Sequence, residues 1–196
     1  MKYVKMLGLL AVAAAAFMAF AATASATTVT SPEGTTYTGK IVAEAEGGGI
    51  TVDGPADINC GESHVEGEVE GHGSSVTATG KISKWTFEQC GVHLTIETKG
   101  SLAVHTDAET SNGNGTLTAS GSSLRADITS LGISCTYSTN ETDIGTLTGS
   151  NVTGGTATLD INSSPIPRTG GSFFCGSSGA LTGSYVITSP STFYVD

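Results

Sequence analysis

Two histidines and two acidic residues near the middle of the chain have the residue types of a metal site. His93 and His105 lie on either side of Lys99-Gly100, a step that is typical of a β-hairpin turn. A three-residue loop ending at this glycine pairs apolar with apolar residues and places the two histidines opposite each other. Glu97 and Asp107 have matching strand parity, so two imidazoles and a carboxylate could bind Zn²⁺ or Cu²⁺. The alternative, which such pairs on sheets more often represent, is a solvated hairpin face.

A second group of acidic side chains lies along one predicted strand. Glu66, Glu68 and Glu70 follow His64 at a spacing of two residues, which places all four on one face. The sequence lacks the Asp-rich loop of known calcium motifs. A glycosidase pair would need two carboxyl groups facing each other across a sugar. We therefore expect a solvated acidic strand.

Nucleophilic catalysis has little support in the sequence. There is no Gly-x-Ser-x-Gly elbow, and Ser177 lies within Gly176–Gly179, a stretch that is typical of a turn. The cysteines are expected to be oxidised, which removes a thiolate nucleophile. The sequence therefore presents no catalytic motif built on serine or cysteine.

The four cysteines predict two disulfides. Their number is even, and their shortest spacing, between Cys60 and Cys90, is 30 residues, whereas structural metal sites use close pairs. Together with Cys135 and Cys175 they allow three pairings, among which spacing alone does not choose.

A weak internal repeat selects one pairing. The copies cover about residues 34–105 and 115–195, and each contains an Ile-x-Cys step followed by an aromatic segment with a second cysteine. If each copy closes on itself, the bridges are Cys60–Cys90 and Cys135–Cys175. The aromatic residues beside the second cysteines are expected to pack on these bridges rather than on sugars. They are Trp85, Phe87, Phe173 and Phe174.

The first 26 residues have the layout of a secretory signal peptide. Lys2 and Lys5 precede an apolar run, and Ala24–Ala26 provides small residues for cleavage. The remaining residues, 27–196, are predicted to form a single domain that is secreted, either extracellular or associated with the cell surface. Removal of the two lysines leaves 6 basic against 18 acidic residues, a net charge of −12. Binding to nucleic acid or to an anionic membrane surface is therefore not expected, and neither is a membrane span after signal removal.

The mature sequence predicts an all-β fold. Apolar residues alternate with polar ones over short runs, and Gly, Asn and Asp steps separate these runs. About a dozen short strands with such turns indicate an antiparallel β-sandwich or barrel-like fold. With the repeat, we expect two related units, each closed by its own disulfide and sharing one core.

Several segments resemble a group of secreted bacterial β-rich proteins of uncharacterised function. The resemblance implies an exported β-protein and brings no activity and no site residues. The segments that carry it are Thr30-Ser31-Pro32, Ser134–Tyr137, Ile144–Gly149, Ala157–Ile161 and Gly183–Thr188.

These observations favour an exported, non-catalytic β-protein with a binding or structural role at the cell surface or outside the cell. Its expected partner is an envelope or matrix polysaccharide or another surface protein, and no cofactor is expected. The alternative hypothesis is a secreted hydrolase, which could use a metal, with a site assembled around His93 and His105.

Overall fold

The computed structural model describes residues 28–45, 48–52, 57–72, 77–90, 93–97, 101–105, 113–128 and 131–195. The predicted signal peptide and Asp107 lie outside the described residues. No helix in the described part of the chain is long and apolar enough to cross a membrane.

The described chain is almost all β-strand, as the alternating sequence pattern predicts. The strands are β1 (Val29–Thr30), β2 (Gly39–Ala45), β3 (Gly48–Val52), β4 (Asp57–Cys60), β5 (Glu62–His72), β6 (Thr77–Glu88), β7 (His93–Glu97), β8 (Ser101–His105), β9 (Asn114–Ser120), β10 (Ser123–Ile128), β11 (Ile133–Ser138), β12 (Thr142–Thr148), β13 (Thr158–Asn162), β14 (Ile166–Gly171), β15 (Ser178–Ser189) and β16 (Tyr194–Val195). A short helix, α2 (Ser150–Thr153), connects β12 to β13.

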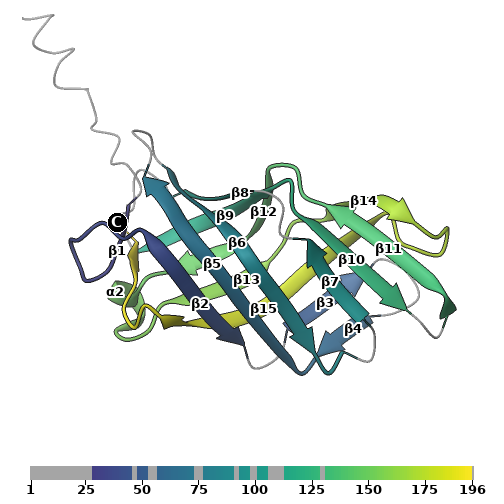
Figure 1. Cartoon of the computed structure of the whole chain (residues 1–196), viewed down its shortest axis with the longest axis horizontal. Helices are drawn as coiled ribbons and strands as arrows, with labels where there is room; N and C mark the ends of the chain where they lie inside the picture. Colours follow the sequence, from purple (N-terminus) through teal and green to yellow (C-terminus); the bar gives the residue numbers. More distant parts are fainter. Residues whose placement is uncertain are drawn as a thin grey trace, which may run out of the picture.

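Eight of these strands form a closed antiparallel ring. Each pairs with the ring strand that follows it in the chain, and β15 pairs with both β13 and β2, which closes the circle. Of the two predicted forms of the all-β fold, this part of the molecule therefore has the barrel-like one (Figure 1). The ring consists of β2, β5, β6, β8, β9, β12, β13 and β15.

The other large group of strands forms an extension at one end of the ring. In a ring of antiparallel neighbours, successive connections alternate between the two ends, and every second connection here carries additional strands. They are β3 and β4, then β7, then β10 and β11, then β14. Strands β14, β11, β10 and β7 pair in that order, while β3 pairs with the first half of β15 and β4 pairs with β3. Figure 1 shows this extension on the right, away from β1, α2 and the C-terminus.

The two halves of the chain build the ring in the same way. The first supplies β2, β5, β6 and β8, with a pair of extension strands after its first ring strand and one after its third. The second supplies β9, β12, β13 and β15 with the same arrangement. This order matches the two related units expected from the sequence repeat.

Both predicted disulfides are confirmed. Cys60 pairs with Cys90, and Cys135 pairs with Cys175. In each unit the bridge joins the second strand of the inserted pair, β4 or β11, to the chain beside the single inserted strand. The bridges therefore hold the extension together, where the strands are short.

Inward-facing apolar side chains form the core inside the ring. The two-residue period is broken in β12, where a bulge beside Asp143 shifts the register so that Ile144 and Leu147 both point inward. Burying such a side chain fully stabilises the fold by about 1.5–3 kcal/mol. The largest fully buried side chains are Tyr137, Tyr185 and Phe193.

Candidate functional site

The structure corrects the predicted hairpin of the metal site. β7 pairs with β10, and β8 pairs with β6 and β9, so β7 and β8 are not hairpin partners. The backbone of His93 lies opposite Asp127, whereas that of His105 lies opposite Thr77 and Thr116. The predicted opposition of the two histidines is wrong.

The reason is that local alternation fits more than one partner strand. In the backbone register Leu94 lies opposite Ala126 and Ile96 lies opposite Leu124, so apolar positions of β7 are paired with apolar positions of β10. The expected match of apolar with apolar is satisfied by a strand far away in the sequence. Among the predicted metal ligands, His93 and Glu97 share β7, His105 lies on β8, and Asp107 is outside the described residues. In the described part of the chain no three His, Cys, Asp or Glu side chains are grouped as metal ligands would be.

The acidic strand forms cross-strand ion pairs on the outside of the ring. Glu66 on β5 pairs with Lys40 on β2, and Lys81 on β6 pairs with Glu68 and Glu70. The hydrogen bond from Lys40 lowers the pKa of Glu66, and the hydrogen bonds to Glu70 and Glu68 raise the pKa of Lys81. The Nε2 atom of His64 lies 3.4 Å from the Oε1 atom of Glu66. Lys40 thus offsets the charge of one carboxylate, and Lys81 is shared by the other two, on a solvent-facing surface.

The aromatic residues beside the cysteines divide into an inner pair, with Trp85 buried and Phe87 half-buried, and an exposed pair. Trp85 is 7% exposed, stacks on Phe87 at 5.6 Å between ring centroids, and packs inside the ring. Phe173 is 92% exposed and Phe174 is 65% exposed. The expectation that all four pack on the bridges is therefore wrong for the second unit.

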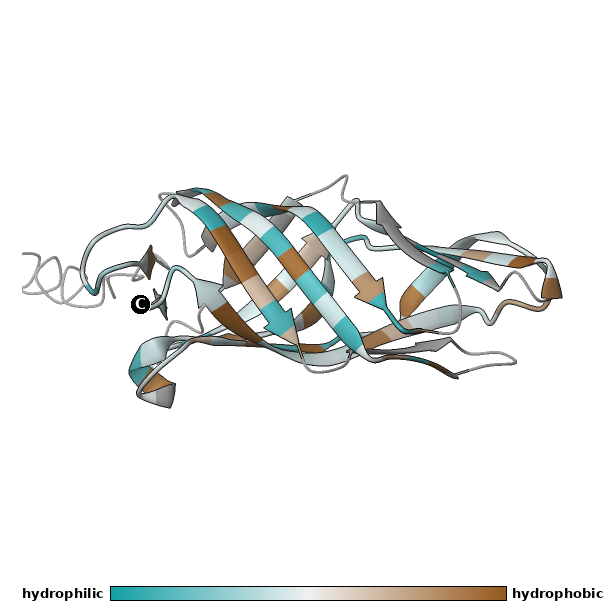
Figure 2. Ribbon diagram, turned by 60° about the horizontal axis from the view of Figure 1, so that its bottom comes forward, coloured by the Kyte–Doolittle hydropathy of each residue, from teal (hydrophilic) through white to brown (hydrophobic). Residues whose placement is uncertain are grey.

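Phe173 and Phe174 form the aromatic tip, which lies in the loop between β14 and β15. This loop is at the end of the extension farthest from the C-terminus, where Figure 2 shows hydrophobic segments in brown among paler ones. The two rings are 6.0 Å apart with an interplanar angle of 75°, so they form a convex edge-to-face pair rather than a flat platform.

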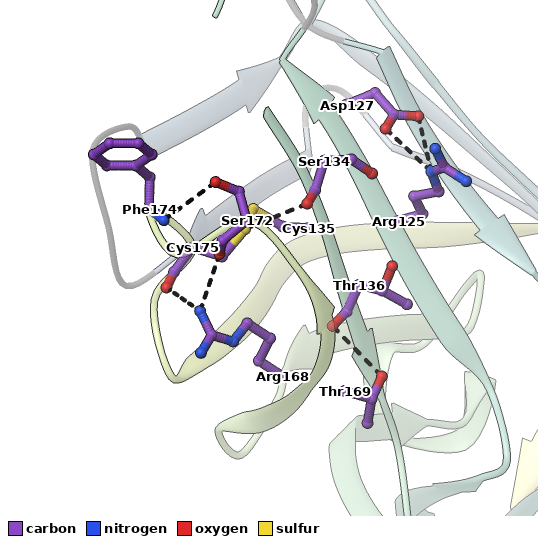
Figure 3. Close-up of a disulfide and its surroundings, with 10 residues drawn as sticks. All are labelled: Arg125, Asp127, Ser134, Cys135, Thr136, Arg168, Thr169, Ser172, Phe174 and Cys175. Carbon is purple, nitrogen blue, oxygen red and sulfur yellow. Dashed lines mark hydrogen bonds and ion pairs between the residues drawn. A yellow bond between two sulfur atoms is a disulfide. The ribbon is translucent and has the colours of Figure 1, made fainter. Parts of the chain in front are cut away.

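A disulfide and several hydrogen bonds hold the loop that carries the tip (Figure 3). Cys175 is bridged to Cys135 on β11, and the backbone N–H of Ser172 donates to the carbonyl of Ser134 at 3.0 Å. Arg168 Nη1 donates to the carbonyls of Cys175 at 2.6 Å and Ser172 at 3.2 Å. The backbone N–H of Phe174 donates to Ser172 Oγ at 3.3 Å. The two phenyl rings therefore project from a braced loop.

The surroundings of the aromatic tip carry few charges. Residues 128–140 and 169–195 contain no Asp, Glu, Lys, Arg or His. Leu131, which precedes β11 at the same end of the extension, is 62% exposed. The loop and the segments beside it therefore present mainly apolar and hydroxyl groups, and the charges near them include Arg168 and the Arg125–Asp127 pair.

The sequence around Phe173 and Phe174 does indicate that the aromatic tip is exposed, although proximity to Cys175 suggests packing on the bridge. Adjacent residues on a strand point to opposite faces, so a pair such as Phe173-Phe174 cannot enter one core from a regular strand. Glycines at Gly170-Gly171 and Gly176 on either side are typical of a loop. Together these features indicate two aromatic side chains on a turn.

The interior of the ring contains an apolar cavity of about 90 Å³. All eight ring strands contribute to its walls, and Val29 and Phe193 cover the end away from the extension. Trp85 and Ile82 separate it from a second space of about 30 Å³.

Comparison with protein-family models, with curated proteins and with solved structures finds no match.

Proposed function

We propose that this is an exported, non-catalytic binding protein that attaches to a component of the cell envelope or extracellular matrix through the aromatic tip. The observation that carries the proposal is the exposure of Phe173 and Phe174 on a braced loop. Leaving a phenylalanine in water rather than burying it costs about 1.5–3 kcal/mol. The exposure of two adjacent phenylalanines at the end of the molecule is explained if a partner covers them.

Bracing of the loop supports a binding role. A loop that is already ordered loses less conformational entropy when a partner binds. The disulfide and the two hydrogen bonds from Arg168 provide this order before any contact. Large aromatic anchors inserted into a pocket commonly provide most of the binding energy of an interface.

The shape of the tip favours another surface protein over a polysaccharide as partner. A sugar ring stacks on a flat, accessible aromatic face that polar groups surround. Here the two rings stand at 75° to each other and project outward. A convex apolar pair of this kind fits an apolar pocket in a protein surface.

The alternative of a secreted hydrolase has lost its main support. It depended on a hairpin register that would bring His93 and His105 together, and the two residues instead lie on strands with different partners. No observation of the described residues favours it over the binding role.

Sedimentation with cell envelopes tests the proposal. The oxidised mature protein is mixed with envelopes of the producing cells, and bound protein is measured as its concentration rises. We expect saturable binding that soluble polysaccharides do not displace. The Phe173→Ser/Phe174→Ser double variant is expected to bind at least tenfold more weakly.

The matched control removes an exposed apolar side chain from the ring instead. Val186 is 43% exposed on β15, so Val186→Ser changes surface hydrophobicity without touching the tip. It is expected to bind like the wild type. Equal binding by the double variant would refute the role of the tip, and displacement by sugars would identify a polysaccharide partner.

A further inference from the structure

We infer that the inside of the ring is a binding site for one small, uncharged, apolar molecule. This site is separate from the aromatic tip, because the cavity lies within the ring and the tip lies at the end of the extension. The inference therefore stands or fails independently of the proposed function.

The walls of the cavity determine the chemistry of the ligand. The accessible surface of the walls is almost wholly apolar, and such a space does not hold water well because water finds few hydrogen-bond partners there. An uncharged apolar molecule can enter without losing hydrogen bonds to the protein. Its buried wall residues include Ala43, Val65, Ala78, Leu117, Leu147, Ile161 and Ile187.

Small side chains on two ring strands leave the space open. Ala43 on β2 and Ala78 on β6 face the cavity, whereas most of their neighbours in the wall are Val, Leu or Ile. The glycines beside them have a different role. A Cβ atom at Gly67 would lie 2.8 Å from the carbonyl oxygen of Lys81, and one at Gly80 would lie 2.6 Å from that of Glu68. These glycines allow the strands to approach, and the alanines leave the volume.

The polar groups near the cavity are occupied with one another. Trp85 Nε1 donates to Ser63 Oγ and to Tyr185 Oη, both at 3.1 Å. The hydroxyls of Ser63 and Tyr185 are also hydrogen-bonded to each other at 2.9 Å. Because this cluster satisfies itself, it offers a ligand no free donor or acceptor. A charged or strongly polar molecule would therefore enter at a large desolvation cost.

The volume of the cavity sets the size of the ligand. A protein cavity of about 150 Å³ holds benzene or xenon, and this one, at about 90 Å³, is smaller. Xenon or an alkyl group of a few carbon atoms fits it without rearrangement. The cover at its end is slight, since β1 and β16 pair through two residues each.

Trp85 provides a direct test, because it lines the cavity and is the single tryptophan of the chain. Xenon, a heavy atom that quenches fluorescence on contact, is applied at increasing pressure to the oxidised mature protein. We expect saturable quenching, whereas iodide, which stays in water, is expected to leave the fluorescence unchanged. Quenching that does not saturate, or none, would overturn the inference.

Filling the cavity should abolish the effect. Ala78→Leu occupies the space and is expected to weaken xenon binding at least tenfold, while Ala45→Leu, on β2 but outside the cavity, leaves it within twofold. If Ala78→Leu does not fold, Ala43→Val adds only two methyl groups and replaces it. Equal saturable quenching in wild-type and filled variants would place xenon elsewhere and contradict the site.

The class of ligand is tested with molecules of similar size. Thermal unfolding is measured with butane, 1-butanol and butylammonium at equal concentration. We expect butane to raise the unfolding temperature most and butylammonium not at all. The Ala78→Leu variant should lose the response to butane, and the opposite order of the three probes would refute an apolar site.

Discussion

The guanidinium of Arg168 joins the two sides of the loop that carries the aromatic tip, because it donates to the carbonyl of Cys175 at 2.6 Å and to that of Ser172 at 3.2 Å. The residue lies at the surface and belongs to β14, next to the loop it holds. Its contribution to the stability of the whole fold is therefore small, and its contribution to the order of the loop is larger.

Arg168→Met separates these two contributions. We expect the free energy of unfolding in urea to fall by about 1 kcal/mol, because one of the lost hydrogen bonds is exposed and the other is only partly buried. Envelope binding is expected to weaken several-fold, because the loop must then be ordered on contact. Arg125→Met, an exposed arginine on β10 bonded to Asp127, is the control and should leave envelope binding unchanged. Unchanged binding by Arg168→Met would show that the loop is ordered without it.

Gly171 is required at the end of β14. Its φ of +112° is a conformation that residues with a side chain rarely adopt, and a Cβ atom there would lie 2.2 Å from the carbonyl oxygen of Ser134. We expect Gly171→Ala to lower the free energy of unfolding by about 1–3 kcal/mol from backbone strain, with the steric clash in addition. Gly170→Ala is the control, since the nearest atom to its Cβ would be 3.7 Å away in the side chain of Thr136. Similar unfolding curves for both variants would contradict the strained geometry.

The two disulfides close loops of similar length, but we expect their removal to affect envelope binding differently. The sequence separations are 30 residues for Cys60–Cys90 and 40 for Cys135–Cys175. Replacing either pair by serines is expected to lower the free energy of unfolding by about 3.5–4 kcal/mol. The difference appears in binding, because only the second bridge holds the aromatic tip. The Cys135→Ser/Cys175→Ser variant should lose envelope affinity at temperatures where it is still folded, whereas the Cys60→Ser/Cys90→Ser variant should keep it.

The disulfides could be predicted from the sequence because the repeat is a long-range signal. The copies place Cys60 and Cys135 at equivalent positions, so the repeat favours, among the three pairings, the one in which each copy closes on itself. The same symmetry appears in the structure as two sets of four ring strands with matching insertions. Alternation of apolar and polar residues was sufficient for the strands themselves.

Strand partners could not be predicted from the same alternation. The apolar residues of β7 match those of β8 and of β10 equally well, and the ring decides between them because β8 is needed between β6 and β9. β7 and β8 therefore follow each other in the chain without pairing as a hairpin. The exposure of Phe173 was missed for a related reason, since proximity to a cysteine in the sequence does not say on which side of the bridge a ring lies.

The cluster of Tyr185, Trp85 and Ser63 makes the fold sensitive to alkaline pH. Burial raises the pKa of Tyr185 above its ordinary value of 10.0. The folded state therefore keeps the phenolic proton at pH values where the unfolded chain loses it. This contribution to stability is complete below pH 10 and is lost as the pH rises from 10 toward the folded-state pKa. We expect the free energy of unfolding of the wild type to fall over that range.

Tyr185→Phe removes the titrating group and leaves its ring in place. At pH 7 the variant is expected to be about 1 kcal/mol less stable, because Trp85 Nε1 and Ser63 Oγ each lose one hydrogen-bond partner. Trp85 Nε1 keeps Ser63 Oγ, and Ser63 Oγ also keeps the carbonyl of Thr86. Above pH 10 its stability should fall less steeply than that of the wild type, so that the two curves converge. Part of the slope remains, because burial also raises the pKa of Tyr37. Urea unfolding from pH 7 to pH 11 measures both curves, and parallel curves would mean that Tyr185 does not carry the alkaline transition.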